Sequence, residues 1–316
     1  MTGMRILLAG ATGTAGRATL EALRIAGHTV VCFVRQPVDL GVEARVGDVA
    51  DEASLARDGF RAETFDAVVS CIASRSGTPR DAWAVDHDAN LALLRAAQGA
   101  GVAHFVLLSA ICVQKPALEF QRAKLAFEAQ LIASGLRYSI VRPTAFFKSL
   151  SGQLDRVRAG KPFLVFGNGR LTACKPISDA DLGAYIAQCL VLPERANAVL
   201  PIGGPGPAIT PMDQVAALSR ILGRPVKVKR VPVALITAIR AGLHLGGRVS
   251  PKMAEKAELA GIGRYYATES MLVWDAARGV YDAQATPETG TDTLFDFYKA
   301  LITEGRSVAL GDHSVF

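Results

Sequence analysis

The sequence predicts an α/β protein with a Rossmann-type, doubly wound parallel sheet and a smaller C-terminal substrate lobe. In its first half, short apolar runs alternate with amphipathic stretches of helical spacing, an order typical of strands and helices that build a parallel sheet. A glycine-rich turn joins the first apolar run to the first helical stretch, where folds of this class hold a nucleotide. The chain has 316 residues, half of them apolar and 30 of them glycine, which suits a large buried core.

The first predicted strand, residues 6–9, ends at three glycines in the pattern G-x-x-G-x-x-G. Gly10 would permit the tight turn, Gly13 would let a pyrophosphate approach the backbone, and Gly16 would let the helix pack closely on the strand. The spacing is not the standard dinucleotide one, but the position between strand and helix favours nucleotide binding over a purely structural turn. The residues expected to hold the nucleotide at this turn are Gly10, Thr12, Gly13, Thr14, Gly16 and Arg17.

The second predicted strand, residues 29–34, ends at Arg35, where NAD-binding proteins carry an acidic residue for the ribose 2′-hydroxyl. An arginine can instead pair with a 2′-phosphate, and Arg17 can assist it. We therefore predict NADPH as the cofactor, the alternative being that Arg35 is a solvated loop charge. A short third strand over residues 45–48 ends in Asp48, which could reach the adenine or could cap the next helix.

The strand and helix rhythm continues through residue 143 and then loosens. Strands are predicted at 67–73, 104–110 and 137–141, and helices at 88–101 and 120–134. Beyond Pro143, strands are expected at 161–166, 172–177, 198–202 and 226–231, and helices at 178–192, 210–223 and 233–245. Thr210, Pro211 and Asp213 supply the N-cap, the first-turn proline and the acidic residue that open the helix at 210.

These elements predict an NADP-binding domain over residues 1–150, with its sheet completed by residues 172–203, and a substrate-binding lobe over residues 204–316. The helix at 233–245 is strongly apolar but too short to span a bilayer. Core packing is the default interpretation of that helix. The alternatives are that it covers a large apolar ligand or touches a membrane surface peripherally.

The composition excludes several classes of protein. The net charge of +6 arises from 35 Lys and Arg against 29 Asp and Glu, without a long basic run, so an anionic small molecule is expected as partner and no nucleic acid. Five scattered cysteines form no C-x-x-C pair and indicate free thiols of a reducing compartment, with no metal site. The chain starts almost directly in a strand without a signal-peptide pattern, and we expect a cytoplasmic protein.

Ser109 ends a predicted strand, and Lys124 lies on the following helix in the frame Phe120-Gln121-Arg122-Ala123-Lys124. Longer stretches are Leu-Leu-Ser-Ala-Ile-Cys-Val-Gln-Lys-Pro at residues 107–116 and Tyr-Tyr-Ala-Thr-Glu-Ser-Met-Leu-Val at residues 265–273. Together with the glycine turn, they resemble the divinyl chlorophyllide 8-vinyl reductases, an atypical NADPH-dependent branch of the short-chain dehydrogenase superfamily. The resemblance runs from the glycine turn almost to the C-terminus.

The resemblance implies reduction of the 8-vinyl group of 3,8-divinyl chlorophyllide, or of its protochlorophyllide precursor, to ethyl in (bacterio)chlorophyll synthesis. Phe120 stands where the superfamily carries its tyrosine acid, so ordinary carbonyl chemistry by that acid is ruled out. Hydride delivered to the outer vinyl carbon would leave an electron pair conjugated with the macrocycle, and the macrocycle would serve as electron sink. Phe120 by itself favours a non-catalytic NADP sensor or a structural subunit, whereas the block at 265–273 favours the reductase, because a sensor has no evident reason to carry it.

The resemblance also implies roles for individual residues. Lys124 would bind the ribose and phosphate of NADPH, unless it is an ordinary surface lysine. Ser109, at the end of the preceding strand, would also contact the cofactor. The candidates for the acid that supplies the second hydrogen lie in the matching stretches, although adjacent tyrosines commonly serve packing and a lone glutamate commonly serves as a cap. These candidates are Tyr265, Tyr266, Glu269 and Lys115.

Overall fold

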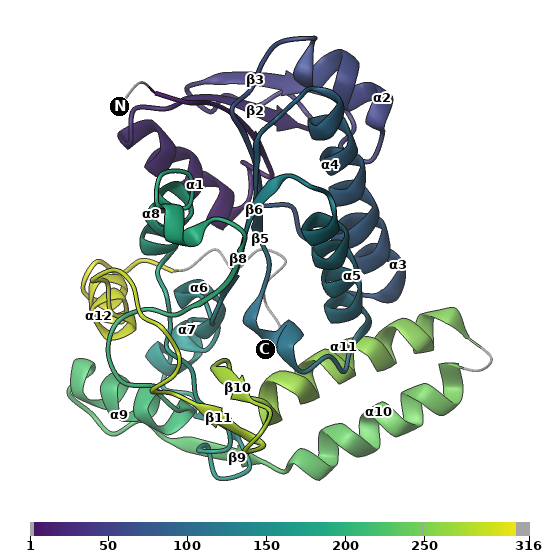
Figure 1. Cartoon of the computed structure of the whole chain (residues 1–316). Coiled ribbons are helices and arrows are strands. Elements are labelled where there is room, and N and C mark those ends of the chain that lie inside the picture. Colours follow the sequence, from purple (N-terminus) through teal and green to yellow (C-terminus); the bar gives the residue numbers. More distant parts are fainter. Residues whose placement is uncertain (1–2, 248–249, 308–316) are drawn as a thin grey trace. The chain divides into compact units, whose positions relative to one another are not determined.

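The computed structural model describes residues 3–247 and 250–307 and contains two compact units (Figure 1). The first unit takes in the chain up to Val113 together with Glu119–Pro143 and Asp179–Pro201. The second unit takes in Gln114–Leu118, Thr144–Ser178 and the described residues from Ile202 onward. The chain therefore passes repeatedly between the units, while the assignment of a cofactor domain and a substrate lobe stays a prediction.

The first unit is built on a seven-stranded sheet with the order β3-β2-β1-β4-β5-β6-β8. Its strands are β1 (Arg5–Ala9), β2 (Thr29–Val34), β3 (Glu43–Val46), β4 (Ala67–Ser70), β5 (His104–Leu108), β6 (Arg137–Pro143) and β8 (Ala198–Ile202). Strands β1 to β6 pair in parallel. The order reverses between β1 and β4, and open sheets of this kind bind ligands at such a reversal. The predicted Rossmann-type fold is confirmed.

Helices cover both faces of this sheet, as its strands require. The side chains of β1 from Ile6 to Ala9 and all of β4 are buried, so neither face can meet water. In Figure 1, α1 (Thr14–Ile25) and α8 (Asp179–Gln188) lie on one face, and α4 (Asn90–Gly99) and α5 (Glu119–Ala133) lie on the other. Phe105 and Phe127 pack between the sheet and α5 with ring centroids 6.0 Å apart.

Shorter helical segments connect these elements. They are α2 (Glu52–Ser54), α3 (Pro79–Ala82), the π-helical turns η1 (Leu55–Phe60) and η2 (Trp83–Ala89), and the 3-10 turns η3 (Ile111–Gln114) and η4 (Pro193–Arg195). The helix expected from residue 88 thus begins earlier, because α3 and η2 run directly into α4.

The region after the third strand differs from the prediction in two respects. The strand β3 lies at Glu43–Val46, two residues earlier than expected, where it pairs with β2 from Val31 to Val34. The residue that caps the next helix is Asp51, whose carboxylate accepts a hydrogen bond from the Ala53 N–H at 3.0 Å. The capping alternative for Asp48 is therefore wrong, since Asp48 closes a turn by accepting from the Ala50 N–H.

The second unit contains two small sheets and six helices among its described residues. The strands β7 (Phe163–Phe166) and β9 (Val228–Val231) pair in parallel, and β10 (Val273–Asp275) and β11 (Val280–Asp282) form an antiparallel hairpin. The helices are α6 (Phe147–Leu150), α7 (Leu154–Arg158), α9 (Pro211–Ile221), α10 (Val233–Gly247), α11 (Pro251–Thr268) and α12 (Leu294–Thr303). A hydrophobic core that includes Phe147, Val165, Leu218 and Tyr298 brings together segments of this unit that are far apart in the sequence.

The capping pattern predicted at Thr210 is present as a reciprocal pair. The Asp213 N–H donates to the Thr210 hydroxyl at 3.3 Å, and the Thr210 N–H donates to the Asp213 carboxylate at 2.8 Å. These bonds satisfy backbone donors that have no partner within the helix, so α9 starts where the sequence predicts it.

The strand predicted at residues 172–177 is wrong. That segment forms only isolated bridges, Cys174 with Ile209 and Met271, and Ile177 with Phe146. Pro176 has no N–H to donate to a ladder, which prevents a continuous strand at this place. Of the range 172–203 only β8 joins the large sheet. Within residues 3–247 and 250–307, no helix is both long and apolar enough to cross a bilayer.

Candidate functional site

The glycine turn brings α1 very close to the end of β1. Gly10 has a φ of +83°, and a Cβ on this residue would lie 2.5 Å from the carbonyl oxygen of Cys71. A Cβ on Gly16 would lie 2.0 Å from the carbonyl oxygen of Gly10. Both positions therefore exclude any side chain. The N–H of Gly13 donates to the Gly10 carbonyl at 3.1 Å, which closes the turn directly before α1 starts at Thr14.

The entrance to this turn is open and positively polarised. Thr12, Gly13 and Arg17 are exposed, and the first turn of α1 carries no acidic residue that would compete with an anion. The Arg17 guanidinium donates to the Thr12 carbonyl at 3.2 Å, so it lies across the turn. Arg35 is exposed and directly follows β2, two residues after the pairing of Phe33 with Ala9. These features can hold phosphate groups at the place where the strand order of the sheet reverses.

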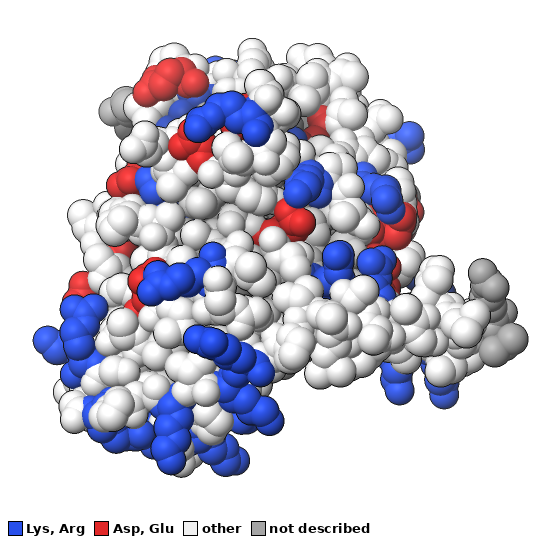
Figure 2. All heavy atoms as spheres, turned by 90° about the horizontal axis from the view of Figure 1, so that it is seen from below, with Lys and Arg blue, Asp and Glu red and all other residues white. Residues whose placement is uncertain are grey.

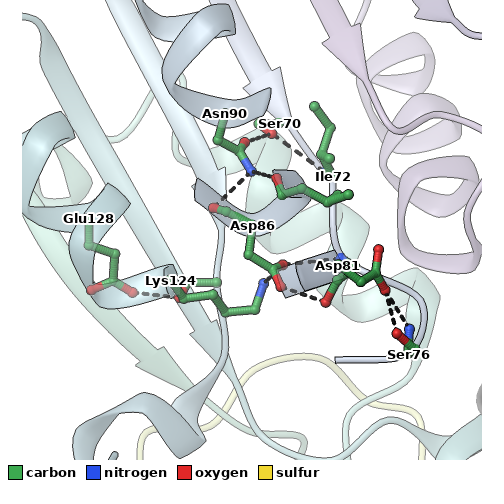
Figure 3. Close-up of polar contacts among 11 residues, drawn as sticks. Ser70, Ile72, Ser76, Asp81, Asp86, Asn90, Lys124 and Glu128 are labelled. Atoms are coloured by element: carbon green, nitrogen blue, oxygen red, sulfur yellow. Dashed lines mark hydrogen bonds and ion pairs between the residues drawn. The ribbon is translucent and has the colours of Figure 1, made fainter. Parts of the chain in front are cut away.

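Lys124 is not an ordinary surface lysine. Its ammonium donates to the carboxylate of Asp86 at 2.8 Å, and the side chains of Lys124 and Asp86 are 12% and 0% exposed (Figure 3). The same carboxylate accepts from the N–H of Ser74 at 3.1 Å and from its hydroxyl at 2.5 Å. Lys124, on α5, is thus linked through Asp86, on η2, to the loop that follows β4.

Sequence analysis missed Asp86 and the neighbouring Asn90. Asn90 is buried, accepts from the Ser70 hydroxyl at 2.6 Å and donates to the carbonyl of Val85 at 3.1 Å (Figure 3). A signal for both residues exists, because they are four positions apart on the face of a helix that buries Leu93 and Leu94. Polar side chains on a buried helix face need partners, and here these partners form the network around Lys124.

Ser109 has a different surrounding from the one that its superfamily role implies. Its hydroxyl donates to the Glu128 carboxylate at 2.5 Å, and Glu128 is also paired with Arg142. Both Ser109 and Glu128 are buried. The hydroxyl proton of Ser109 is therefore engaged by a buried carboxylate. Since Phe120 is also buried and has no polar atom, the strand end holds no arrangement for protonating a carbonyl oxygen.

A second polar group lies within the second unit. The Lys115 ammonium and the Tyr281 hydroxyl both donate to the same oxygen of Glu269, at 2.7 and 2.8 Å. The Tyr265 hydroxyl donates to the carbonyl of Lys115 at 3.2 Å. Burial, followed by the hydrogen bond to the Glu269 carboxylate, raises the pKa of Tyr281 far above its ordinary value, so Tyr281 keeps its proton.

The β10–β11 hairpin holds this group in place. Trp274 and Tyr281 are cross-strand partners with ring centroids 4.8 Å apart, and the Lys115 ammonium lies 4.5 Å from the Trp274 ring centroid. The Gln114 side chain binds the backbone on either side of Val273, accepting from the Trp274 N–H at 2.8 Å and donating to the Leu272 carbonyl. The stretches 107–116 and 265–273 therefore meet through Gln114 and Lys115.

Not all predicted acid candidates join this group. Tyr265 is buried, whereas the Tyr266 ring packs edge-on against it and is 37% exposed. Trp274 and Tyr281, which complete the group, were not predicted, because a three-residue strand has too little pattern to reveal a hairpin.

Four of the five thiols are unsuited to act as nucleophiles. Burial raises the pKa of Cys32, Cys71 and Cys174 to about 12 and that of Cys189 to about 11, so these groups are protonated at neutral pH. Among the residues that the structure describes, no cluster of His, Cys, Asp and Glu could hold a metal ion.

Comparison with known proteins places this geometry in a wider context. Residues 10–193 match the NAD(P)H-binding family. A chloroplastic divinyl chlorophyllide a 8-vinyl-reductase from Zea mays is 46% identical, with 98% of this chain and 82% of that protein covered. A photosystem II assembly factor from Cyanophora paradoxa is 29% identical over 75% of this chain and 74% of its own length.

Among solved structures, an NADPH-dependent quinone oxidoreductase from Escherichia coli, complexed with NADPH, has a TM-score of 0.67 at 19% identity. That alignment covers 94% of this chain and 99% of the oxidoreductase, and at this identity it supports the fold alone.

The parallel sheet, its glycine turn and the family match define an NAD(P)H-binding protein of the Rossmann type. Within that class, the chain belongs to the family of the divinyl chlorophyllide a 8-vinyl-reductases, because the identity of 46% extends over nearly its whole length. The resemblance drawn from the sequence is confirmed.

Proposed function

We propose that this protein reduces the 8-vinyl group of 3,8-divinyl chlorophyllide, or of its protochlorophyllide precursor, to an ethyl group with NADPH. The protein is an oxidoreductase, and the observation that carries the proposal is its 46% identity over 98% of the chain to a reductase of that name. That similarity spans both units, whereas the assembly-factor similarity is lower and covers 75% of the chain. Reduction of a carbon–carbon double bond also suits a strand end that lacks an acid for a carbonyl oxygen.

The residues at the place where the strand order reverses fit a nicotinamide dinucleotide. The side-chain-free approach at Gly10 and Gly16 leaves the N–H groups at the start of α1 for the pyrophosphate, with Gly13, Thr12 and Thr14 around it. Asp48, exposed after β3, is assigned to the adenine side, and Lys124 and Ser109 to the ribose next to the nicotinamide.

Arg35 supports NADPH in preference to NADH. It occupies the end of β2, the position from which an acidic residue would bind a free 2′-hydroxyl, and its exposed guanidinium matches a 2′-phosphate instead. Arg17, on the first turn of α1, adds a second positive charge on the same edge of the sheet.

In this reaction, the protein has to bind the cofactor and the substrate and to supply one proton. The bound cofactor supplies a hydride, which we assign to the outer vinyl carbon of the substrate. The electron pair of the broken double bond then spreads over the macrocycle, so no oxyanion forms and no fixed tyrosine acid is needed at position 120. The reaction is complete when a proton reaches the inner carbon and gives the ethyl group.

The group around Glu269 is our candidate for the proton supply. Glu269 accepts hydrogen bonds from the Lys115 ammonium and the Tyr281 hydroxyl on one carboxylate oxygen, so two proton-bearing groups are held in defined directions beside it. Tyr265 fixes the backbone of Lys115. The exposed ring of Tyr266 offers an apolar face suited to a flat macrocycle.

The exposed side of α10 supports a further part of the proposal, contact with an anionic lipid surface. None of the side chains of α10 is buried, its sequence contains no carboxylate, and Leu235 and Ile239 are about half exposed. The neighbouring strand β9 and its approach carry the exposed cations Lys227, Lys229 and Arg230. Figure 2 shows Lys and Arg gathered on one part of the second unit and the α10–α11 hairpin largely uncharged on the same view. Apolar and cationic surface together favour the interface of an anionic bilayer.

The activity is tested by incubating the purified protein anaerobically with NADPH and divinyl chlorophyllide, followed by chromatography and mass detection. The expected product is about two mass units heavier and has a Soret band shifted to the blue, because one double bond leaves the conjugated system. Binding of NADPH with no change in the pigment would contradict the proposal and favour a sensor or a structural subunit.

Arg35→Ala tests the cofactor preference. Loss of a charge-assisted bond to the 2′-phosphate should raise the KM for NADPH about tenfold and leave the KM for NADH unchanged. Arg24→Ala, at the opposite end of α1, is the matched control and should change neither value. Equal effects of Arg35→Ala on both cofactors would count against a 2′-phosphate contact.

Glu269→Gln tests the proton supply. The amide keeps the shape of the carboxylate but cannot hold two donated protons with the same strength, so kcat should fall about 100-fold with little change in the KM for NADPH. Glu255→Gln, at an exposed position on α11, the helix that ends directly before Glu269, is the control and should keep full activity. An unchanged kcat for Glu269→Gln would remove Glu269 from the proton path.

Vesicle sedimentation tests the lipid contact. The protein should pellet with vesicles rich in phosphatidylglycerol and stay in solution with pure phosphatidylcholine, and Leu235→Glu with Ile239→Glu should abolish pelleting. Ile25→Glu, at an apolar residue of α1 that is 78% exposed, serves as control. Pelleting that is unchanged by the double substitution would show that α10 is not the contact surface.

A further inference from the structure

The ion pair between Asp86 and Lys124 is unusual for its burial. The Asp86 side chain has no exposed surface, and that of Lys124 is 12% exposed. Removing two charges from water costs free energy, and the attraction between the charges commonly does no more than offset that cost. Apolar residues of similar size commonly give equal stability. Stability is therefore a weak reason for keeping this pair, and the contact of Asp86 with the loop that follows β4 points to a role in binding.

The backbone around Asp86 is built to hold this carboxylate in one place. Asp86 lies in η2, a π-helical turn, and such turns frequently occur at functional sites. The Asn90 amide donates to the carbonyls of Val85 and Asp86, at 3.1 and 3.3 Å, and accepts from the Ser70 hydroxyl. The turn is thus tied to the end of β4, the strand next to β1 and its glycine turn.

Asp86 also fixes the loop that follows β4. Both the N–H and the hydroxyl of Ser74 donate to its carboxylate, so Ser74 and Lys124 share one acceptor (Figure 3). This loop begins at Cys71, whose carbonyl oxygen lies 2.5 Å from the position that a Cβ of Gly10 would take. One carboxylate therefore links the lysine on α5 to the loop that borders the glycine turn.

We propose that Asp86 is a positioning residue for the cofactor, which holds the Lys124 ammonium and the Ser74 loop in the arrangement that binds NADPH. The inference rests on the proposed function only in taking NADPH as the ligand of this edge of the sheet. Asp86 does not itself touch the cofactor and acts through Lys124.

A purely electrostatic role for Asp86 gives the opposite expectation. NADPH is strongly anionic, so removal of a nearby negative charge would by itself tighten its binding. A positioning role predicts weaker binding, because an unpaired, partly buried ammonium turns toward water and leaves its place. The sign of the change in affinity upon Asp86→Asn therefore separates the two roles.

The test is a titration of NADPH, followed by the fluorescence of the bound cofactor, on the wild type, Asp86→Asn, Lys124→Met and the double variant. We expect each single substitution to weaken binding about tenfold, a change that corresponds to about 1.4 kcal/mol, and the double variant to be no weaker than either. Asp81→Asn is the control: Asp81 lies on the adjoining α3 and accepts hydrogen bonds from the N–H and the hydroxyl of Ser76, so the affinity of this variant for NADPH should equal that of the wild type.

Unchanged or tighter binding by Asp86→Asn, or effects that multiply in the double variant, would overturn the inference. If Asp86→Asn does not fold, Ser74→Ala decides, since it removes one donor to Asp86 and should weaken binding about threefold. Unaltered affinity of Ser74→Ala would then refute the positioning role. Failure of the wild type to bind NADPH would refute the proposed function instead, so the two failures are distinguishable.

Discussion

The close approach of α1 to β1 is the contact on which the first unit depends. Gly16 packs so tightly on the carbonyl of Gly10 that a methyl group would lie 2.0 Å from the oxygen, and α8 packs on α1 in the same way through Gly183. Since β1 and β4 are the neighbouring strands between which the strand order reverses, this contact directs the N-terminus of α1 at that place. A single larger residue at Gly16 would move the helix, the turn and the phosphate-binding N–H groups together.

The polar groups of the two units explain how a short-chain dehydrogenase fold can work without its tyrosine. Carbonyl reduction creates an oxyanion that must receive a proton, and here Phe120 and the engaged hydroxyl of Ser109 provide no such donor. A conjugated vinyl group has a different need, because the macrocycle itself accepts the electron pair. What remains for the protein is to hold the cofactor and to keep a proton source, and these are the roles that we propose for the Asp86–Lys124 pair and for the Glu269 group.

Features that depend on residues close together in the chain could be predicted from the sequence. The glycine turn and the capping box at Thr210 depend on residues close together in the chain, and both appear where expected. Residues 172–177 and the β10–β11 hairpin could not be predicted in the same way, because their partners are distant and their patterns short. The partners of Asp86 and Tyr281 come from separate elements, so the spacing of Asp86 and Asn90 could reveal a buried polar helix face but not the ion pair with Lys124.

In the proposed reaction, hydride reaches the outer vinyl carbon while the macrocycle takes the electron pair. The most direct measurement uses NADPH carrying deuterium at the transferred position, with the label in the ethyl product located by NMR. We expect cofactor deuterium only on the terminal methyl carbon. With unlabelled NADPH in heavy water, we expect deuterium only on the carbon attached to the ring. Cofactor deuterium on the carbon attached to the ring would contradict the proposed reaction, because that addition would place the electron pair outside the conjugated system.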